Sequence, residues 1–196
     1  MVIVKIGVLA LQGAFREHKK MLESCGAEAI EVRTTDDVNS VDGLIIPGGE
    51  STTIGKMMVD WGLLDTIKDR ASHGMPIYGT CAGMILLAKD IVGSEQPRLG
   101  LMDICVRRNA FGRQVESFEA DLHVAEFGTE PVRAVFIRAP YIESAGREVK
   151  VLAVVDEHIV IARQGNYLAT AFHPELTQDD RIHKFFIGMV QESLGK

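Results

Sequence analysis

The sequence predicts an α/β protein whose doubly wound, mostly parallel sheet has helices on both faces and additional antiparallel strands. In the first half of the chain, short apolar runs such as residues 43–46 alternate with apolar positions at helical spacing. Continuous apolar runs are typical of strands that a parallel sheet buries on both faces. After Gly93, short stretches with alternating apolar and polar residues follow one another, and this pattern favours antiparallel strands.

The first half is expected to contain four strands that alternate with helices. The apolar run 2–10 predicts the first strand, and the helix after it should end at Gly26, because glycine is favoured where a helix terminates. Three further strands are expected at 28–32, 41–46 and 76–78. The remaining helices are expected after the capping residues 34–37, after the capping residues 51–53, at 63–71, and from Cys81 to about Lys89.

The second half is expected to be rich in strands and to close with a helix. The expected strands cover 101–106, 119–124, 132–137, 149–155, 159–163 and 167–172. Residues 156–158 could turn a hairpin, and Asp179 and Asp180 should cap a last helix with apolar residues at helical spacing. Because no linker, repeat or low-complexity segment interrupts the chain, we expect residues 1–196 to form a single domain.

The composition disfavours several functional classes. A net charge of −6 over 196 residues argues against a general nucleic-acid binder. The longest apolar runs fall far short of the ~20 residues that span a bilayer, and the apolar N-terminus lacks the basic residues of a signal peptide. Cys25, Cys81 and Cys105 show no metal-binding spacing, which favours reduced thiols in the cytoplasm over a disulfide framework or a zinc site.

Residues 79–83, Gly-Thr-Cys-Ala-Gly, are the most informative stretch for function. A short apolar strand leads into them and a helix-forming run follows directly, so Cys81 would stand at a sharp strand-to-helix turn. The arrangement matches a nucleophile elbow with cysteine in place of serine. Free N–H groups at the start of the helix favour the thiolate over the thiol. Taken alone, the motif also fits a buried cysteine at an ordinary turn.

A cysteine nucleophile needs a general base, and His173 is the best candidate among the six histidines. It follows the apolar strand 168–172, so it should stand at the carboxyl end of a strand. Glu175 lies two residues further on, where its carboxylate can accept the second imidazole N–H. The alternative is a turn with a helix-capping acid. The other five histidines, His18 and His183 among them, are expected to be surface or packing residues.

Residues 47–51, Pro-Gly-Gly-Glu-Ser, follow the third expected strand. Adjacent glycines let backbone N–H groups approach a ligand closely and point at developing negative charge, so this loop is expected to form an oxyanion hole. The competing interpretation is a phosphate-binding loop of the Walker A type, with Gly49, Gly55 and Lys56 as its conserved positions. That motif has four residues between the glycines and a Ser or Thr after the lysine, but here five residues intervene and Met57 follows.

In this order, the three elements resemble the class I glutamine amidotransferases, also called triad glutaminases. The resemblance covers almost the whole chain and implies a flavodoxin-like fold. Within the family, the sequence resembles in particular the glutaminase subunit of pyridoxal phosphate synthase. The stretches that carry this narrower resemblance are 7–13, 47–53, 79–83, 108–114 and 136–140.

The resemblance implies a glutaminase that works with a second protein. The chain would hydrolyse L-glutamine without a cofactor or metal. A separate barrel-shaped synthase subunit would then use the ammonia with a pentose phosphate and a triose phosphate to build the vitamin B6 coenzyme. By the same resemblance, the residues that bind glutamine would be Gly49, Glu50, Ser51, Arg108, Ile137 and Arg138. Arginine suits a substrate carboxylate, Glu50 could hold an ammonium group, and Gln12 would adjust with the oxyanion loop when the synthase docks.

The expected reaction starts with attack of the Cys81 thiolate on the side-chain amide of glutamine. Backbone N–H groups near Gly49 and Ala82 would hold the oxyanion, and His173, oriented by Glu175, would protonate the departing ammonia. Two other functions stay open. A related cysteine-elbow amidase is disfavoured by the Pro-Gly-Gly and His-Pro-Glu motifs, and a non-catalytic regulatory subunit would bind the partner without releasing glutamate.

Overall fold

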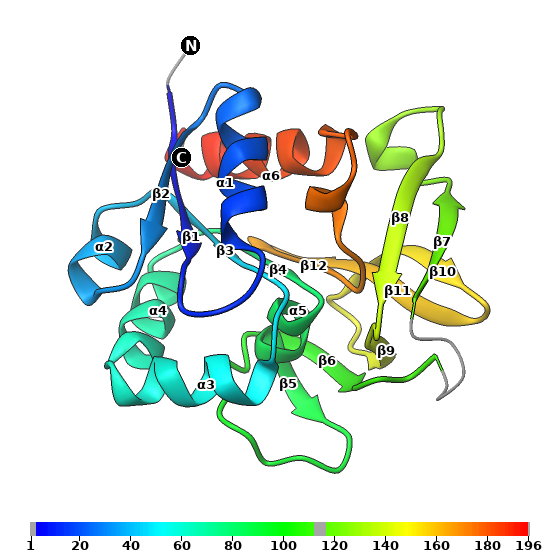
Figure 1. Ribbon diagram of the computed structural model, residues 1–196, viewed down its shortest axis with the longest axis horizontal. Helices are drawn as coiled ribbons and strands as arrows, with labels where there is room; N and C mark the ends of the chain where they lie inside the picture. The colour runs from blue at the N-terminus through cyan, green and yellow to red at the C-terminus, as the bar shows by residue number, and fades with distance from the viewer. Residues whose placement is uncertain (1–2, 112–116, 196) are drawn as a thin grey trace.

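The computed structural model describes residues 3–111 and 117–195, and it has an α/β architecture built on one curled ten-stranded sheet (Figure 1). Five strands at one side of the sheet are parallel, in the order β2-β1-β3-β4-β12. Their bounds are Lys5–Leu9 for β1, Glu28–Val32 for β2, Gly43–Ile46 for β3, Ile77–Thr80 for β4 and Tyr167–Thr170 for β12. Every residue of β3 and β4 is buried, as their continuous apolar sequences predict.

The rest of the sheet is largely antiparallel and comes from the second half of the chain. Beyond β12 the order continues β11-β9-β6-β5, and β10 pairs with β11 in a hairpin. The bounds are Ala88–Ile91 for β5, Met102–Arg107 for β6, Tyr141–Ala145 for β9, Lys150–Val155 for β10 and His158–Gln164 for β11. A separate antiparallel pair is formed by β7 (Ser117–Leu122) and β8 (Val132–Ile137). The change in character after Gly93 is therefore confirmed.

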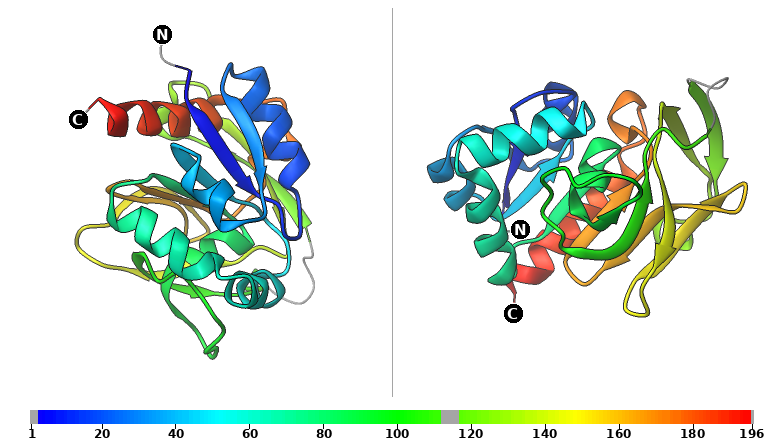
Figure 2. Two further views of the ribbon diagram at one scale, coloured as in Figure 1. Left: turned by 90° about the vertical axis from the view of Figure 1, so that its left-hand side faces the viewer. Right: turned by 90° about the horizontal axis from the view of Figure 1, so that it is seen from below.

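Helices cover both faces of the parallel strands (Figures 1 and 2). The pair α1 (Phe15–Ser24) and α6 (Arg181–Leu194) lies on one face. The other face carries α2 (Thr35–Asn39), α3 (Ser51–Asp60), α4 (Leu63–Ser72) and α5 (Ala82–Leu87). The doubly wound prediction is thus confirmed, and the α1 helix ends just before Gly26 as expected. None of the helices in the described ranges is long and apolar enough to cross a membrane.

The expected elements differ from the observed ones after the fourth strand. The helix that should have run to Lys89 ends at Leu87, because the N–H groups of Leu99 and Leu101 donate to its last carbonyls and Ala88 pairs with the strand β6 instead. The strands β5 and β9 were not expected. Residue 2 of the first predicted strand and residues 112–114 of the stretch 108–114 lie outside the described residues.

Candidate active site

Cys81 stands at the turn between β4 and α5 with φ 50° and ψ −103°, a conformation that costs a non-glycine residue about 1–3 kcal/mol. The turn is held by a 2.8 Å hydrogen bond from the Cys81 backbone N–H to the carbonyl of Thr170 in the neighbouring strand. The first N–H groups of α5 point away from the helix and find no acceptor within it. A strained cysteine at a helix start is the geometry of the predicted elbow.

The two glycines of the elbow are required for close packing and not for an unusual φ angle. A side chain at Gly83 would overlap the carbonyl oxygen of Ile46 in β3, and one at Gly79 would overlap the backbone of Gly83. Neither glycine has a positive φ, and the sharp turn is made by Cys81 itself. The two glycines therefore allow the close approach of α5 to β3, and Cys81 alone carries the strained backbone of the turn.

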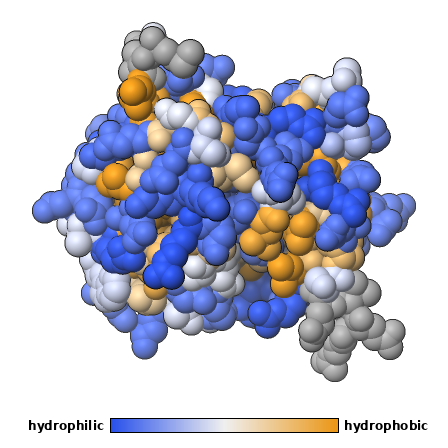
Figure 3. Space-filling view, turned by 45° about the horizontal axis from the view of Figure 1, so that its top comes forward, coloured by the Kyte–Doolittle hydropathy of each residue, from blue (hydrophilic) through white to orange (hydrophobic). Residues whose placement is uncertain are grey.

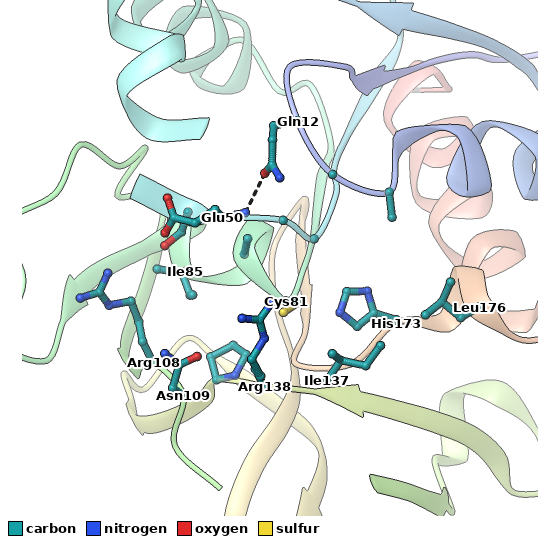
Figure 4. A pocket seen from close by; sticks show the side chains of 17 residues that line it. Gln12, Glu50, Cys81, Ile85, Arg108, Asn109, Ile137, Arg138, His173 and Leu176 are labelled. Atoms are coloured by element: carbon teal, nitrogen blue, oxygen red, sulfur yellow. Dashed lines mark hydrogen bonds between the residues drawn. The ribbon is translucent and has the colours of Figure 1, made fainter. Parts of the chain in front are cut away.

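His173 follows β12 and faces Cys81 across the mouth of the elbow (Figure 4). Its Nδ1–H donates to Oε1 of the buried Glu175 at 2.7 Å, and its backbone N–H donates to Val135. Gly48 packs against both His173 and Cys81: a Cβ placed at Gly48 would overlap the imidazole of His173 and touch Cβ of Cys81. The structure thus brings the three predicted catalytic residues together.

The electrostatics around the imidazole favour its charged form. Burial lowers the pKa of His173, but the neighbouring Cys81 and Glu175 outweigh burial and raise that pKa to about 10. Burial would raise the pKa of Glu175, whereas His18 and His173 lower it below its ordinary value. A carboxylate that stays ionised behind the imidazole is what a base-orienting residue requires.

The glycine-rich loop after β3 is clamped by the segment that precedes α1. The N–H of Ala14 donates to the carbonyl of Gly48 at 3.1 Å, and the side chain of Gln12 accepts the N–H of Glu50 at 2.7 Å. Gly13, with φ 99°, contacts the same loop so closely that any side chain there would overlap Gly48. Since the C=O and N–H of one peptide point in opposite directions, the N–H of Gly49 points away from Ala14.

These elements surround a cavity of about 440 Å³, within the usual range for a small-molecule site. Its lining comes mainly from the ends of β3, β4, β6, β8 and β12 together with the loop before α1. It includes Cys81, His173 and all six residues predicted to bind glutamine, namely Gly49, Glu50, Ser51, Arg108, Ile137 and Arg138. Glu175 lies behind His173, outside the cavity wall. Two wall residues, Asn109 and Arg138, hold positive φ angles of 46° and 42°.

Glu50 has a structural role that the sequence analysis assigned to residues 51–53. Its carboxylate caps α3 by accepting hydrogen bonds from the backbone N–H and hydroxyl groups of Thr52 and Thr53. These bonds lower the pKa of Glu50 to about 2, and the bond from the Thr52 hydroxyl contributes most. Partial burial opposes this shift, because burial alone would raise the pKa. The carboxylate is therefore negatively charged and fixed at the edge of the cavity, and it can still accept from a cationic group of a ligand.

Gln96 is a residue of this site that the sequence analysis missed. It is 91% buried, and its Oε1 accepts from Nη1 of Arg108 at 2.9 Å and from Oγ of Ser51 at 3.3 Å. Two residues predicted to bind glutamine are thus joined through one amide. No sequence pattern marks Gln96, because it lies in the loop between β5 and β6 and meets Ser51 only in the folded chain.

His18 was expected to be a surface or packing residue; it is buried, and it lies against Glu175, the acid of the predicted triad. Its Nε2 lies 3.3 Å from Oε2 of Glu175 and 3.1 Å from Oγ1 of Thr80, and its Nδ1 lies 2.8 Å from Nε2 of His183. The exposed fraction of both His18 and His183 is 0%. A histidine on the apolar face of a predicted helix is the signal that could have pointed to this contact.

The sequence pattern of the SNO glutamine amidotransferase family matches residues 8–192. The "pyridoxal 5'-phosphate synthase subunit PdxT" of Pelotomaculum thermopropionicum is 62% identical over 94% of this chain and 94% of its own. The protein of the same name from Desulforamulus reducens is 61% identical over 95% of this chain and 99% of its own. A crystal structure described as a glutamine amidotransferase aligns with a TM-score of 0.91 at 52% identity, over 95% of this chain and 98% of its own.

Proposed function

Because this chain belongs to the SNO glutamine amidotransferase family, we propose that it is the glutamine-hydrolysing subunit of a pyridoxal 5'-phosphate synthase. The observation that supports this function best is that Cys81 and His173 line a cavity of amino-acid size, with Glu175 bonded to His173 directly behind the wall. The chain acts as one domain over residues 1–196, in the cytoplasm, where its thiols stay reduced.

In the first step, the thiolate of Cys81 attacks the side-chain carbonyl carbon of glutamine. The proton of the thiol passes to His173, whose raised pKa makes the thiolate–imidazolium pair the reactive form. The oxyanion that develops is held by backbone N–H groups of Gly49 and Ala82, the latter at the start of α5.

In the second step, the imidazolium of His173 gives its proton to the leaving nitrogen, ammonia departs, and a glutamyl thioester remains on Cys81. A water molecule then loses a proton to His173 and attacks the thioester carbonyl, which releases glutamate and regenerates the Cys81 thiolate beside the imidazolium of His173. Glu175 keeps the imidazole in one orientation throughout, since it holds Nδ1–H while the other nitrogen works.

The substrate is bound by groups from several strand ends. Arg108 and Arg138 pair with the α-carboxylate, and Glu50 lies where its carboxylate receives the α-ammonium group. Gly49, Ser51 and Ile137 complete the contact surface. Charged groups would thus bind the amino-acid end while Cys81 attacks the amide end, which explains selection of an amino acid with a terminal amide.

The ammonia goes to a barrel-shaped synthase subunit, which packs on the rim of the cavity. Two apolar side chains of the lining, Ile137 and Leu176, are 36% and 47% exposed. Apolar groups at the edge of a polar cavity suit contact with a second protein. The face shown in Figure 3 is mainly hydrophilic but carries a distinct hydrophobic patch.

Glutamate release, measured with and without the purified synthase subunit, tests this function. The wild-type chain should release glutamate in the complex, and Cys81→Ala should abolish the release while still binding the partner. Cys105→Ala is the matched control, because Cys105 is a free thiol in β6 away from the cavity wall and its loss should leave turnover unchanged.

Two outcomes would contradict the proposal. Partner binding without glutamate release by the wild type would identify a regulatory subunit. Equal turnover of glutamine and of unrelated amides would identify a general cysteine-elbow amidase.

A further inference from the structure

The triad acid Glu175 has an oxygen that the triad does not use. Oε1 accepts from His173, but Oε2 is fully buried and, among the described residues, has no hydrogen bond of ordinary geometry. Nε2 of His18 lies 3.3 Å from this oxygen. An ionised buried oxygen without a donor is costly, so a facing imidazole nitrogen is a strong indication of a functional contact.

We propose that His18 is a positioning residue of the glutaminase reaction, which holds Oε2 of Glu175 and thereby fixes the carboxylate that orients His173. The inference rests on the proposed function, because it extends the same Cys81–His173–Glu175 site by one member. His18 touches neither the cavity nor the sulfur, and it would act only through Glu175.

The hydrogen-bond pattern selects one tautomer for each buried histidine. An ionised Glu175 can only accept, so its contact with His18 places the proton on Nε2, and the same N–H also reaches Oγ1 of Thr80 at 3.1 Å, which accepts. A neutral His18 then has a bare Nδ1, and the 2.8 Å contact requires His183 to donate from its Nε2. Nδ1 of His183 then carries only a lone pair. This agrees with the structure, in which that buried nitrogen has no hydrogen-bond partner among the described residues.

The opposite assignment is worse on two counts. A bare Nε2 of His18 would face an oxygen lone pair of Glu175 at 3.3 Å. In addition, His183 would have to carry its proton on Nδ1, where a buried N–H would have no acceptor. An orphaned N–H is rarer and more costly than an orphaned lone pair on a neutral imidazole.

The surroundings keep His18 neutral. Burial lowers its pKa below the ordinary value, and His173 lowers it further, whereas Glu175 and Glu17 raise it. Burial also lowers the pKa of His183, to about 3. The titratable groups around His18 are Glu17 on its own helix, Tyr78 on β4, His183 on α6, and His173 and Glu175 after β12.

The position of His18 in the chain ties the acid to the oxyanion side of the cavity. His18 lies on the first turns of α1, directly after the segment whose Gln12 and Ala14 bond the glycine-rich loop. The segment 12–18 therefore contacts the glycine-rich loop through Gln12 and Ala14, and it contacts Glu175 through His18.

Three substitutions at His18 test the proposal in the complex with the synthase subunit. His18→Leu removes both ring nitrogens, His18→Asn places an amide near Nδ1 only, and His18→Gln extends an amide N–H to the position of Nε2. We expect kcat to fall about 10- to 100-fold in His18→Leu and His18→Asn, as for the loss of other groups that orient a reactive residue. The KM for glutamine should change less than about twofold, and His18→Gln should recover most of the turnover.

A pH profile separates positioning from packing. Without the donor, the pKa of Glu175 rises, so the carboxyl is protonated at a higher pH and the acid limb of kcat should move to higher pH in His18→Leu. The matched control is Tyr78→Phe, which perturbs the same buried cluster by removing the hydroxyl that bonds Thr170. This control should lose thermal stability without any shift of the acid limb.

The proposal is overturned if a folded His18→Leu keeps the wild-type kcat and acid limb, or if His18→Gln is as impaired as His18→Leu. Histidine ¹⁵N chemical shifts of the wild-type protein, recorded without substrate, test it even if the variants do not fold. They should show the Nε2–H tautomer for His18 and His183, and an Nδ1–H tautomer of His18 would refute the assignment. A wild-type complex that releases no glutamate would refute the proposed function instead, while the tautomers would stand.

Discussion

The charge of His173 is set by its two neighbours, because it is buried between Cys81, the proposed nucleophile, and the ionised Glu175. Its pKa of about 10 lies above the ordinary value of 6.5, so the folded state holds the proton more tightly than the unfolded state. The stability gained in this way is complete below pH 6.5 and is lost as the pH rises through about 10. The imidazolium form of His173 should therefore persist across the physiological range.

A pH series of glutaminase activity tests this consequence. Turnover should be flat between pH 7 and pH 9 and should fall with an apparent pKa near 10, because deprotonated His173 cannot give a proton to ammonia. In Glu175→Gln the charge that raises the pKa is lost, so the alkaline limb should move to lower pH and turnover should fall. If Glu175→Gln left the apparent pKa of the alkaline limb unchanged, Glu175 would not act on the imidazole of His173.

Gln96 should affect the binding of glutamine and not the chemical step. Its amide oxygen holds Arg108 and Ser51 in place, and Arg108 lies on the opposite side of the cavity from His173 (Figure 4). Gln96→Leu should raise KM about tenfold, the equivalent of one hydrogen bond to a charged group, with kcat unchanged. Steady-state kinetics with glutamine distinguish the two constants, and a fall in kcat at constant KM would contradict this role.

Sequence alone points to those proposed functional residues that follow a strand and carry a local motif. Cys81, His173 and Glu175 belong to this class, since each stands in a short pattern with a chemical meaning. His18 and Gln96 do not, because their contacts are long-range: His18 meets His183 at a separation of 165 positions. Only the fold shows that a histidine in a helical pattern touches a carboxylate.

At the scale of the elements, the elbow depends on how closely α5 approaches β3. Gly83 contacts the Ile46 carbonyl so tightly that no side chain fits between them, whereas Gly188 in α6 has open space where its Cβ would be. Both are glycines within helices, and they therefore form a matched pair that separates packing from helix propensity.

Gly83→Ala should destabilise the protein by ~3 kcal/mol and lower its melting temperature by roughly 6–12 °C, because the backbone of α5 must move away from β3. Gly188→Ala should instead stabilise the protein by about 1 kcal/mol, since alanine is the better helix former. Thermal unfolding followed by circular dichroism measures both. Equal effects of the two substitutions would mean that the elbow tolerates a wider spacing than the structure shows.

The elements that the sequence predicts well are those whose environment agrees with their own propensity. The buried strands β3 and β4 and the helix α1 belong here. Residues 88–91 contain good helix formers and follow a helix, so only their pairing with β6 makes them a strand. The strand β9 has a single buried residue, Ile142, and thus carries too little apolar pattern to be recognised.

At the scale of the whole molecule, the cavity joins two parts of the chain with different architecture. Cys81 and the glycine-rich loop stand at the ends of parallel strands, whereas Arg108 and Arg138 follow the strands β6 and β8 of the second half. A bound glutamine would contact both parts at once. Ligand binding should therefore stabilise the molecule as a whole and not one segment of it.

The inactive variant Cys81→Ala allows this coupling to be measured without turnover. Glutamine at about 100 times its dissociation constant should add about 2.7 kcal/mol to the free energy of unfolding, which corresponds to roughly 5–10 °C in melting temperature. Hydrogen exchange should slow both at residues 49–51 and at residues 137–138, since the ligand bridges them. Adding Arg108→Met to this variant removes one group that binds the carboxylate and should reduce the shift in melting temperature. In the variant that keeps Arg108, asparagine, which is shorter than glutamine by one methylene, should also give a smaller shift than glutamine. Slower exchange confined to residues 49–51 would mean that the second half of the chain does not bind the substrate, and the arginine assignments would then be wrong.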